Sequence, residues 1–170
     1  MPLTVIGMGN RLCGDDSVGP VILDALKTFH DKRMELVEGG VDALALLELL
    51  AQREHALVID ATRMGLDPGA IRAFSRHEVE MIVTEEHLSL HGMGMAEALQ
   101  LGEQLGMLPE DLKFIGIQPL SVNVNTPLSE PVAASVSAVI DLVIEELQTF
   151  EPAADQLSMQ THVDLAHEGK

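Results

Sequence analysis

Aromatic residues are scarce in this chain, which has no tryptophan, no tyrosine and only four phenylalanines among its 170 residues. Stacking of aromatic side chains on bases or sugars is therefore nearly unavailable to it. Hydrophobic residues still make up 46% of the sequence, which excludes wholesale disorder and predicts a core of leucine, isoleucine, valine, alanine and methionine. A chain of this length is expected to form one domain.

Cysteine and long apolar runs are equally scarce. The single cysteine, Cys13, excludes an internal disulfide and a zinc site built from several thiolates. The first residues lack the basic head and apolar stretch of a signal peptide, and no later run reaches the roughly 18 apolar residues of a transmembrane helix. We therefore expect a soluble protein of the reducing cytoplasm.

Positive charge is the third deficit. Lysine and arginine number 10 against 27 aspartates and glutamates, for a formal net charge of −17. Such a surface repels the phosphates of nucleic acids and anionic lipids, so neither nucleic acid nor a membrane is an expected partner. A basic or metal-bearing partner fits this charge better.

Short β-branched runs alternate with longer amphipathic runs, a pattern typical of α/β proteins. It predicts strands at 3–8, 34–38, 56–60, 70–74 and 113–117, and helices at about 17–30, 42–53, 91–106 and 129–149. The first and third strands are apolar on both faces, as expected where helices cover both sides of a mostly parallel sheet. The fourth alternates in polarity and is predicted to lie at an edge.

The predicted fold is a three-layer α/β/α sandwich around a mostly parallel sheet of about five strands. Residues 1–150 form the domain in this prediction. Residues 151–170 are rich in polar and small residues without a clear apolar period, so we expect a mobile or loosely docked tail.

Functional residues in such a sheet lie beyond the carboxyl ends of the strands. Gly7 and Gly9 lie at the end of the first strand and just after it and resemble a dinucleotide fingerprint, but Leu12 stands where the third glycine is needed. Two carboxylates, Asp15 and Asp16, also occupy the helix entrance where a pyrophosphate would bind. These departures argue against a nucleotide site.

Asp15 and Asp16 have two interpretations. Either residue, or the following Ser17, could cap the next helix, while a spare carboxylate at this position could bind a cation or orient water. Asp60, which ends the third strand, could likewise form a local turn with the backbone that follows it. If the strand order is 2-1-3, however, Asp16 and Asp60 converge.

His91 is the histidine best placed to join these acids, because a polar loop precedes it and a glycine-rich helix start follows it. Two carboxylates and one imidazole form a metal-ligand set of mixed hardness. A single histidine is often only a surface or core residue, and His87 is the nearest competitor as a ligand. Nucleophilic catalysis is disfavoured, since no Gly-x-Ser-x-Gly elbow is present and carboxylates beside Cys13 disfavour its thiolate.

An ordered set of segments between about residues 3 and 149 resembles the nickel-iron hydrogenase maturation endopeptidases. The segments are Gly7–Asn10 with Asp15, Asp16 and Gly19; Gly39–Leu44; Val58–Ala61; His91 and Gly92; and Ile115–Pro119 with Leu128 and Ser129. The resemblance implies a three-layer α/β/α fold with a five-stranded sheet. It also implies removal of a C-terminal extension from the hydrogenase large-subunit precursor after nickel insertion.

The resemblance further implies a metal-binding trio of Asp16, Asp60 and His91, which approaches nickel carried by the substrate rather than held permanently by the enzyme. The loop Gly39, Gly40 and Val41 could then bind the extended peptide. Asp16 is shorter than the glutamate of some relatives. Glu38 stands where relatives commonly carry aspartate, which leaves its role open.

The chemistry of cleavage has two candidate forms. In the first, Asp16 or Asp60 positions water as a general base while the metal or a protonated partner polarises the scissile carbonyl. In the second, nickel only docks the substrate, and the two carboxylates share a proton in the manner of an aspartic protease. A different class of function, a nickel-dependent assembly chaperone that does not cleave, would use the same trio.

Deletion of residues 151–170 is expected to leave both folding and precursor cleavage intact, because this segment lacks the apolar pattern needed to pack on the domain. Urea unfolding and cleavage assays of the full chain and of a chain ending at Phe150 test this. A loss of cleavage or a lower unfolding midpoint in the shortened chain would contradict the prediction.

Overall fold

The computed structural model describes residues 2–78 and 95–150. The strands are β1 (Leu3–Met8), β2 (Met34–Gly40), β3 (His55–Ala61), β4 (Ile71–Ser75) and β5 (Asp111–Ile117). The α-helices are α1 (Val18–Leu26), α2 (Ala43–Leu50), α4 (Met95–Gln104) and α5 (Glu130–Thr149), and short 3-10 turns form η1 (Gly14–Ser17) and η2 (Lys27–Phe29). Residues 76–78 are also helical.

The sheet has five strands in the order β2-β1-β3-β5-β4. The β1–β2, β1–β3 and β3–β5 pairs are parallel, and β4 pairs antiparallel with β5 at the edge. Three expectations are thereby confirmed: the mostly parallel sheet, the 2-1-3 order of its first strands and the edge position of the fourth strand.

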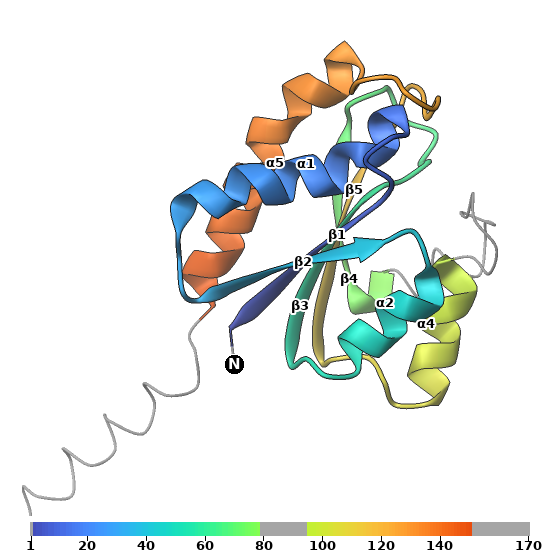
Figure 1. Ribbon diagram of the computed structural model, residues 1–170. Helices are drawn as coiled ribbons and strands as arrows, with labels where there is room; N and C mark the ends of the chain where they lie inside the picture. The colour runs from blue at the N-terminus through green and yellow to red at the C-terminus, as the bar shows by residue number, and fades with distance from the viewer. Residues whose placement is uncertain (1, 79–94, 151–170) are drawn as a thin grey trace, which may run out of the picture.

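Helices cover both faces of this sheet, with α1 and α5 on one side and α2 and α4 on the other (Figure 1). Strand β1 is buried along its whole length, and its side chains pack alternately against the helices on the two faces of the sheet. Val5 packs in the core with α1 and α5, and Ile6 packs in the core with α2 and α4. The three-layer α/β/α prediction is confirmed, and the apolar character of β1 on both faces follows from it.

The observed helices differ from the predicted ones at their ends. The single helix expected at 17–30 is instead the series η1, α1 and η2, which ends at His30 in the left-handed conformation (φ 49°). Helix α2 is shorter than the 42–53 prediction and begins after Asp42, whose carboxylate accepts the Leu44 and Ala45 amides. The predicted start of the third helix at 91 and the predicted tail at 151–170 lie outside the described residues.

The beginning of α1 rests directly on the backbone of β1 and β3. A Cβ atom added at Gly19 would lie 2.3 Å from the Met8 carbonyl oxygen and 3.0 Å from that of Ile59. At Gly9, where φ is +116°, a Cβ would lie 1.8 Å from the Asp16 carbonyl oxygen. The glycines after the first strand therefore permit close backbone packing, which accounts for them without a bound nucleotide.

In the described ranges, 2–78 and 95–150, we find no helix with the length and apolar character needed to cross a membrane.

Replacing Gly19 with alanine should destabilise the protein by about 2–3 kcal/mol, because the added methyl group meets rigid backbone on two strands. Alanine normally stabilises a helix relative to glycine, so the expected change in unfolding free energy at Gly19 has the opposite sign to the usual one. Gly102 in α4 is the matched control, because the three atoms nearest to its added Cβ belong to the side chains of Leu47 and Leu108 and not to backbone.

The Gly102→Ala variant should stay within about 1 kcal/mol of the wild type. Urea unfolding of both variants makes the comparison. Equal stability of Gly19→Ala and Gly102→Ala would show that α1 is not seated on the strands as described.

Candidate active site

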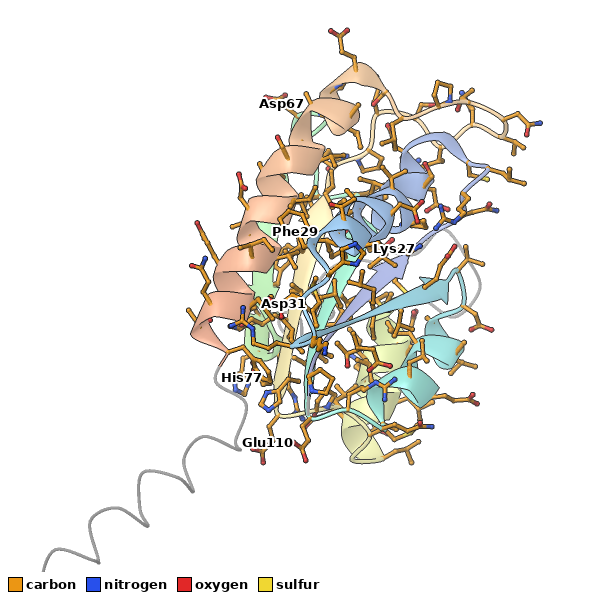
Figure 2. All side chains as sticks on the ribbon, turned by 60° about the vertical axis from the view of Figure 1, so that its left-hand side comes forward. Lys27, Phe29, Asp31, Asp67, His77 and Glu110 are labelled. Carbon is orange, nitrogen blue, oxygen red and sulfur yellow. The ribbon has the colours of Figure 1, made fainter. Side chains whose placement is uncertain are left out.

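The carboxyl ends of the parallel strands lie at the end of the molecule where α5 begins. Figure 2 shows Asp67, in the loop after β3, at this end, and His77 and Glu110 at the opposite end. Asp16 follows β1 here, and Asp60, Gly39 and Gly40 lie in the last residues of β3 and β2. This edge is where α/β proteins of this kind place their sites.

Asp16 lies in η1, and only 7% of its surface is exposed. Its Oδ2 atom accepts a hydrogen bond from the backbone amide of Asn10 at 2.9 Å. The loop after β1 thus folds back on the carboxylate and orients it. Asp16 does not cap helix α1, so the capping interpretation is wrong for this residue.

Asp60 is the penultimate residue of β3 and pairs with Gly116 of β5. Side chains alternate along a strand, so Asp60 projects from the face that carries Val58, toward the α2 and α4 layer. Burial, and then the negative charge of Asp16, raise the pKa of Asp60 to about 7, although a hydrogen bond from the Ala61 amide opposes this. Asp16 and Asp60 are therefore close enough to repel each other.

Neither carboxylate forms an ion pair with any lysine or arginine of the described residues. Like charges that are close together and shielded from water, here a buried Asp16 and a half-buried Asp60, are costly without a counter-ion. Such a pair can relieve the repulsion by holding one proton between two carboxyl groups or by accepting a cation from outside. We name Asp16 and Asp60 the acid pair.

Asp15 is completely buried and has a different role from its neighbour. Its Oδ2 atom accepts hydrogen bonds from the amides of Leu120 and Ser121 and from the Ser129 hydroxyl, and its Oδ1 atom accepts one from the Ser129 amide, at 2.7–2.9 Å. Burial alone would raise the pKa of Asp15, but these hydrogen bonds hold it below its ordinary value. The capping interpretation is wrong for Asp15 as well, because it joins a distant loop instead of the helix start.

The third predicted ligand, His91, lies outside the described residues, as does its competitor His87. Within 2–78 and 95–150, no group of three histidine, cysteine, aspartate or glutamate side chains is arranged to hold a metal ion. The metal-binding trio therefore stays a prediction, of which the structure brings two members together.

The predicted peptide-binding segment, Gly39–Val41, comprises the last two residues of the edge strand β2 and the residue after it. Gly39 is buried, and a Cβ there would lie 2.4 Å from the Met8 sulfur. The Gly40 carbonyl accepts a hydrogen bond from the Gly9 amide at 2.7 Å, and Val41 is 44% exposed. This segment therefore adjoins the loop that holds Asp16.

Arg11 was not singled out from the sequence, yet it organises the outer side of this region. Its guanidinium group pairs with Glu38 at 2.8 Å and with Asp24 at 2.6 Å. The hydrogen bonds from Arg11 lower the pKa of Glu38. Both partners are distant in sequence, so no local pattern indicated this contact. It gives Glu38 a structural role as an anchor for the loop after β1.

A cleft of about 400 Å³ lies between β4, β5 and the later part of α5. Its lining includes Phe74, Lys113 and Glu146. It extends toward the end of the sheet opposite the acid pair, so it is separate from the site built around Asp16 and Asp60.

Comparison with known proteins gives a consistent result. A family model described as hydrogenase maturation protease matches residues 21–146. The match includes Asp60 and begins after Asp16. Among curated proteins, the chain is 28% identical over 151 residues to the hydrogenase 2 maturation protease of Escherichia coli, covering 87% of this chain and 92% of that one.

A second relative is the hydrogenase expression/formation protein HupD of Bradyrhizobium diazoefficiens. The two sequences are 30% identical over 151 residues, and the match covers 85% of this chain and 77% of HupD. Among solved structures, the hydrogenase maturating endopeptidase HybD of E. coli superposes with a TM-score of 0.75 at 28% identity. That match covers 88% of this chain and 93% of the other.

The variant Asp60→Asn should be more stable than the wild type at pH 8, by on the order of 2–4 kcal/mol, because it removes a half-buried, poorly solvated charge that repels Asp16. Asp60 has a higher pKa in the folded than in the unfolded state. The wild type therefore loses stability as the pH rises from about 4 to about 7, and the variant does not share this loss.

Urea unfolding between pH 4 and pH 8 measures the difference, with Asp67→Asn as a control at an exposed carboxylate of the same region. A stability gap that is independent of pH, or that also occurs in Asp67→Asn, would refute the prediction.

Proposed function

The chain belongs to the hydrogenase maturation protease family, and we propose that it removes the C-terminal extension of a nickel-iron hydrogenase large-subunit precursor after nickel insertion. The observation that carries this proposal is the acid pair: two neighbouring carboxylates at the functional edge of the sheet, with no cation from the described residues to neutralise them. Peptide hydrolysis needs groups that activate water and protonate the leaving amine.

The charge of the acid pair fits a cation brought by the substrate. Carboxylate oxygens suit hard and borderline divalent ions, and a set with few protein ligands leaves positions open for ligands from a second molecule. In this proposal Asp16, Asp60 and His91 approach nickel that is already bound to the precursor. Nickel is then the feature by which the enzyme distinguishes a loaded precursor from an empty one.

Asp60 is the better candidate for moving protons. With a pKa of about 7, it is present in both protonated and ionised forms near neutral pH, which suits a general base. Asp60 would take a proton from the attacking water as the scissile carbon–nitrogen bond is hydrolysed, and would return it to the leaving amine. Asp16, oriented by the Asn10 amide, would orient the water or the substrate metal.

Exposed apolar side chains on the loops next to η1, which carries Asp16, are consistent with a protein substrate. Leu12, Leu120 and Val124 are each at least 60% exposed, on the loops that follow β1 and β5. Gly40 and Val41 add an accessible edge beside the first of these loops. An extended peptide could pass along Gly39–Val41, where the small residues permit close approach of its backbone.

The proposal predicts that the variants Asp16→Asn and Asp60→Asn cleave nickel-loaded precursor at least about 100-fold more slowly than the wild type, because each lacks a carboxylate used in the reaction. Asp67→Asn should cleave at the wild-type rate. Intact-mass spectrometry of the precursor before and after incubation gives the rates, and a nickel-free precursor is run alongside.

The outcomes separate the alternatives. A C-terminal mass loss restricted to nickel-loaded precursor supports the proposal. A precursor that binds this protein but keeps its full mass would favour the assembly chaperone, and cleavage without nickel would remove the metal from recognition. Wild-type cleavage by either acid variant would exclude that residue as the base.

A further inference from the structure

The loop between β5 and α5, residues 118–129, contacts both segments that carry the acid pair. We call it the 118–129 loop. Gln118 contacts the segment after Asp60: its Oε1 atom accepts hydrogen bonds from the Met64 amide at 2.7 Å and the Leu66 amide at 3.2 Å. The backbone of Gln118 also forms two hydrogen bonds with the far end of that segment. The Gly69 amide donates to the Gln118 carbonyl, and the Gln118 amide donates to the Ala70 carbonyl.

The same loop is fastened to the turn that carries Asp16. The buried carboxylate of Asp15 accepts the Leu120 and Ser121 amides near one end of the loop and the Ser129 amide and hydroxyl at the other. The Asp15 amide in return donates to the Ser121 carbonyl at 2.9 Å. A carboxylate suits this position because all three backbone groups are donors.

Backbone contacts also connect the middle of the 118–129 loop to the residues just before η1. The Asn125 amide donates to the Leu12 carbonyl at 2.6 Å, and Cys13 forms an isolated parallel bridge with Thr126. A Cβ at Gly14 would lie 2.8 Å from the Ser121 carbonyl oxygen and from the Thr126 hydroxyl. The loop therefore lies against η1 without space for one further carbon atom.

We propose that the 118–129 loop holds Asp16 and Asp60 at their working separation, with Asp15 and Gln118 as the positioning residues. Neither residue needs to touch the substrate. Asp15 fixes the loop to the turn of Asp16, and Gln118 fixes it to the segment that leaves Asp60, so a change at either contact alters the geometry of the acid pair. The inference rests on the proposed function for its kinetic consequence.

Two variants remove one contact each with little change in volume. Asp15→Asn places an amide donor against backbone N–H groups, and Gln118→Met removes the acceptor for Met64 and Leu66. Gln118→Glu is the conservative variant, because it keeps an oxygen for those two amides. Val143→Ala is the control for stability alone, since Val143 is fully buried in α5 away from the loop.

In precursor cleavage, Asp15→Asn and Gln118→Met should lower kcat by about 10–100-fold, since misplacement of reacting groups by about 1 Å has an effect of this size. KM should stay within about threefold, and Gln118→Glu should recover most of kcat. A wild-type kcat in folded Gln118→Met would overturn the proposal, as would an equal fall in kcat for Val143→Ala. If Asp15→Asn does not fold, the two Gln118 variants decide the question.

Amide hydrogen exchange tests the contact independently of any cleavage. The Met64 and Leu66 amides should exchange at least tenfold faster in Gln118→Met than in wild type or in Val143→Ala. Unchanged exchange at both amides would refute the positioning role of Gln118. Failure of the wild type to cleave its precursor, with the exchange result as expected, would instead count against the proposed function alone.

Discussion

The geometry of the site depends on one constraint, the close backbone packing of the start of α1 on the ends of β1 and β3. Gly19 lets the helix backbone meet the Met8 and Ile59 carbonyls, and Gly9 lets the loop after β1 pass over the Asp16 carbonyl. Ile59 immediately precedes Asp60, so the same contacts that dock the helix bring Asp16 to Asp60. With side chains at these glycines, the two carboxylates could not be held as they are.

The acid pair is an arrangement that stability alone would not favour. The protein holds a partly exposed Asp60 beside a buried Asp16 without a lysine or arginine from the described residues between them. Arg11, on the same loop, does not neutralise the acid pair, because it pairs with Asp24 and Glu38 on the outer surface. Retaining unneutralised carboxylates is understandable where a substrate supplies the positive charge, and it agrees with the pKa of Asp60 near neutrality.

The sequence predicted the sheet well because its central strands β1 and β3 are buried on both faces over most of their length and therefore appear in the sequence as apolar runs. Convergence of Asp16 and Asp60 followed from strand order and could be anticipated. The roles of Asp15, Arg11 and Gln118 could not, because their partners lie far away in sequence, up to 114 residues in the case of Asp15 and Ser129. Asp15 and Ser17 have ordinary capping chemistry, and only the fold shows that Asp15 binds a distant loop instead.

The most direct test of this account is the titration of the Asp60 carboxyl carbon by nuclear magnetic resonance, in the wild type and in Asp16→Asn. A coupled pair predicts a midpoint of about 7 in the wild type and a lower midpoint once the charge of Asp16 is removed. A wild-type midpoint near the ordinary aspartate value of about 4, or one that Asp16→Asn leaves unchanged, would contradict the claim that the two carboxylates form a coupled pair.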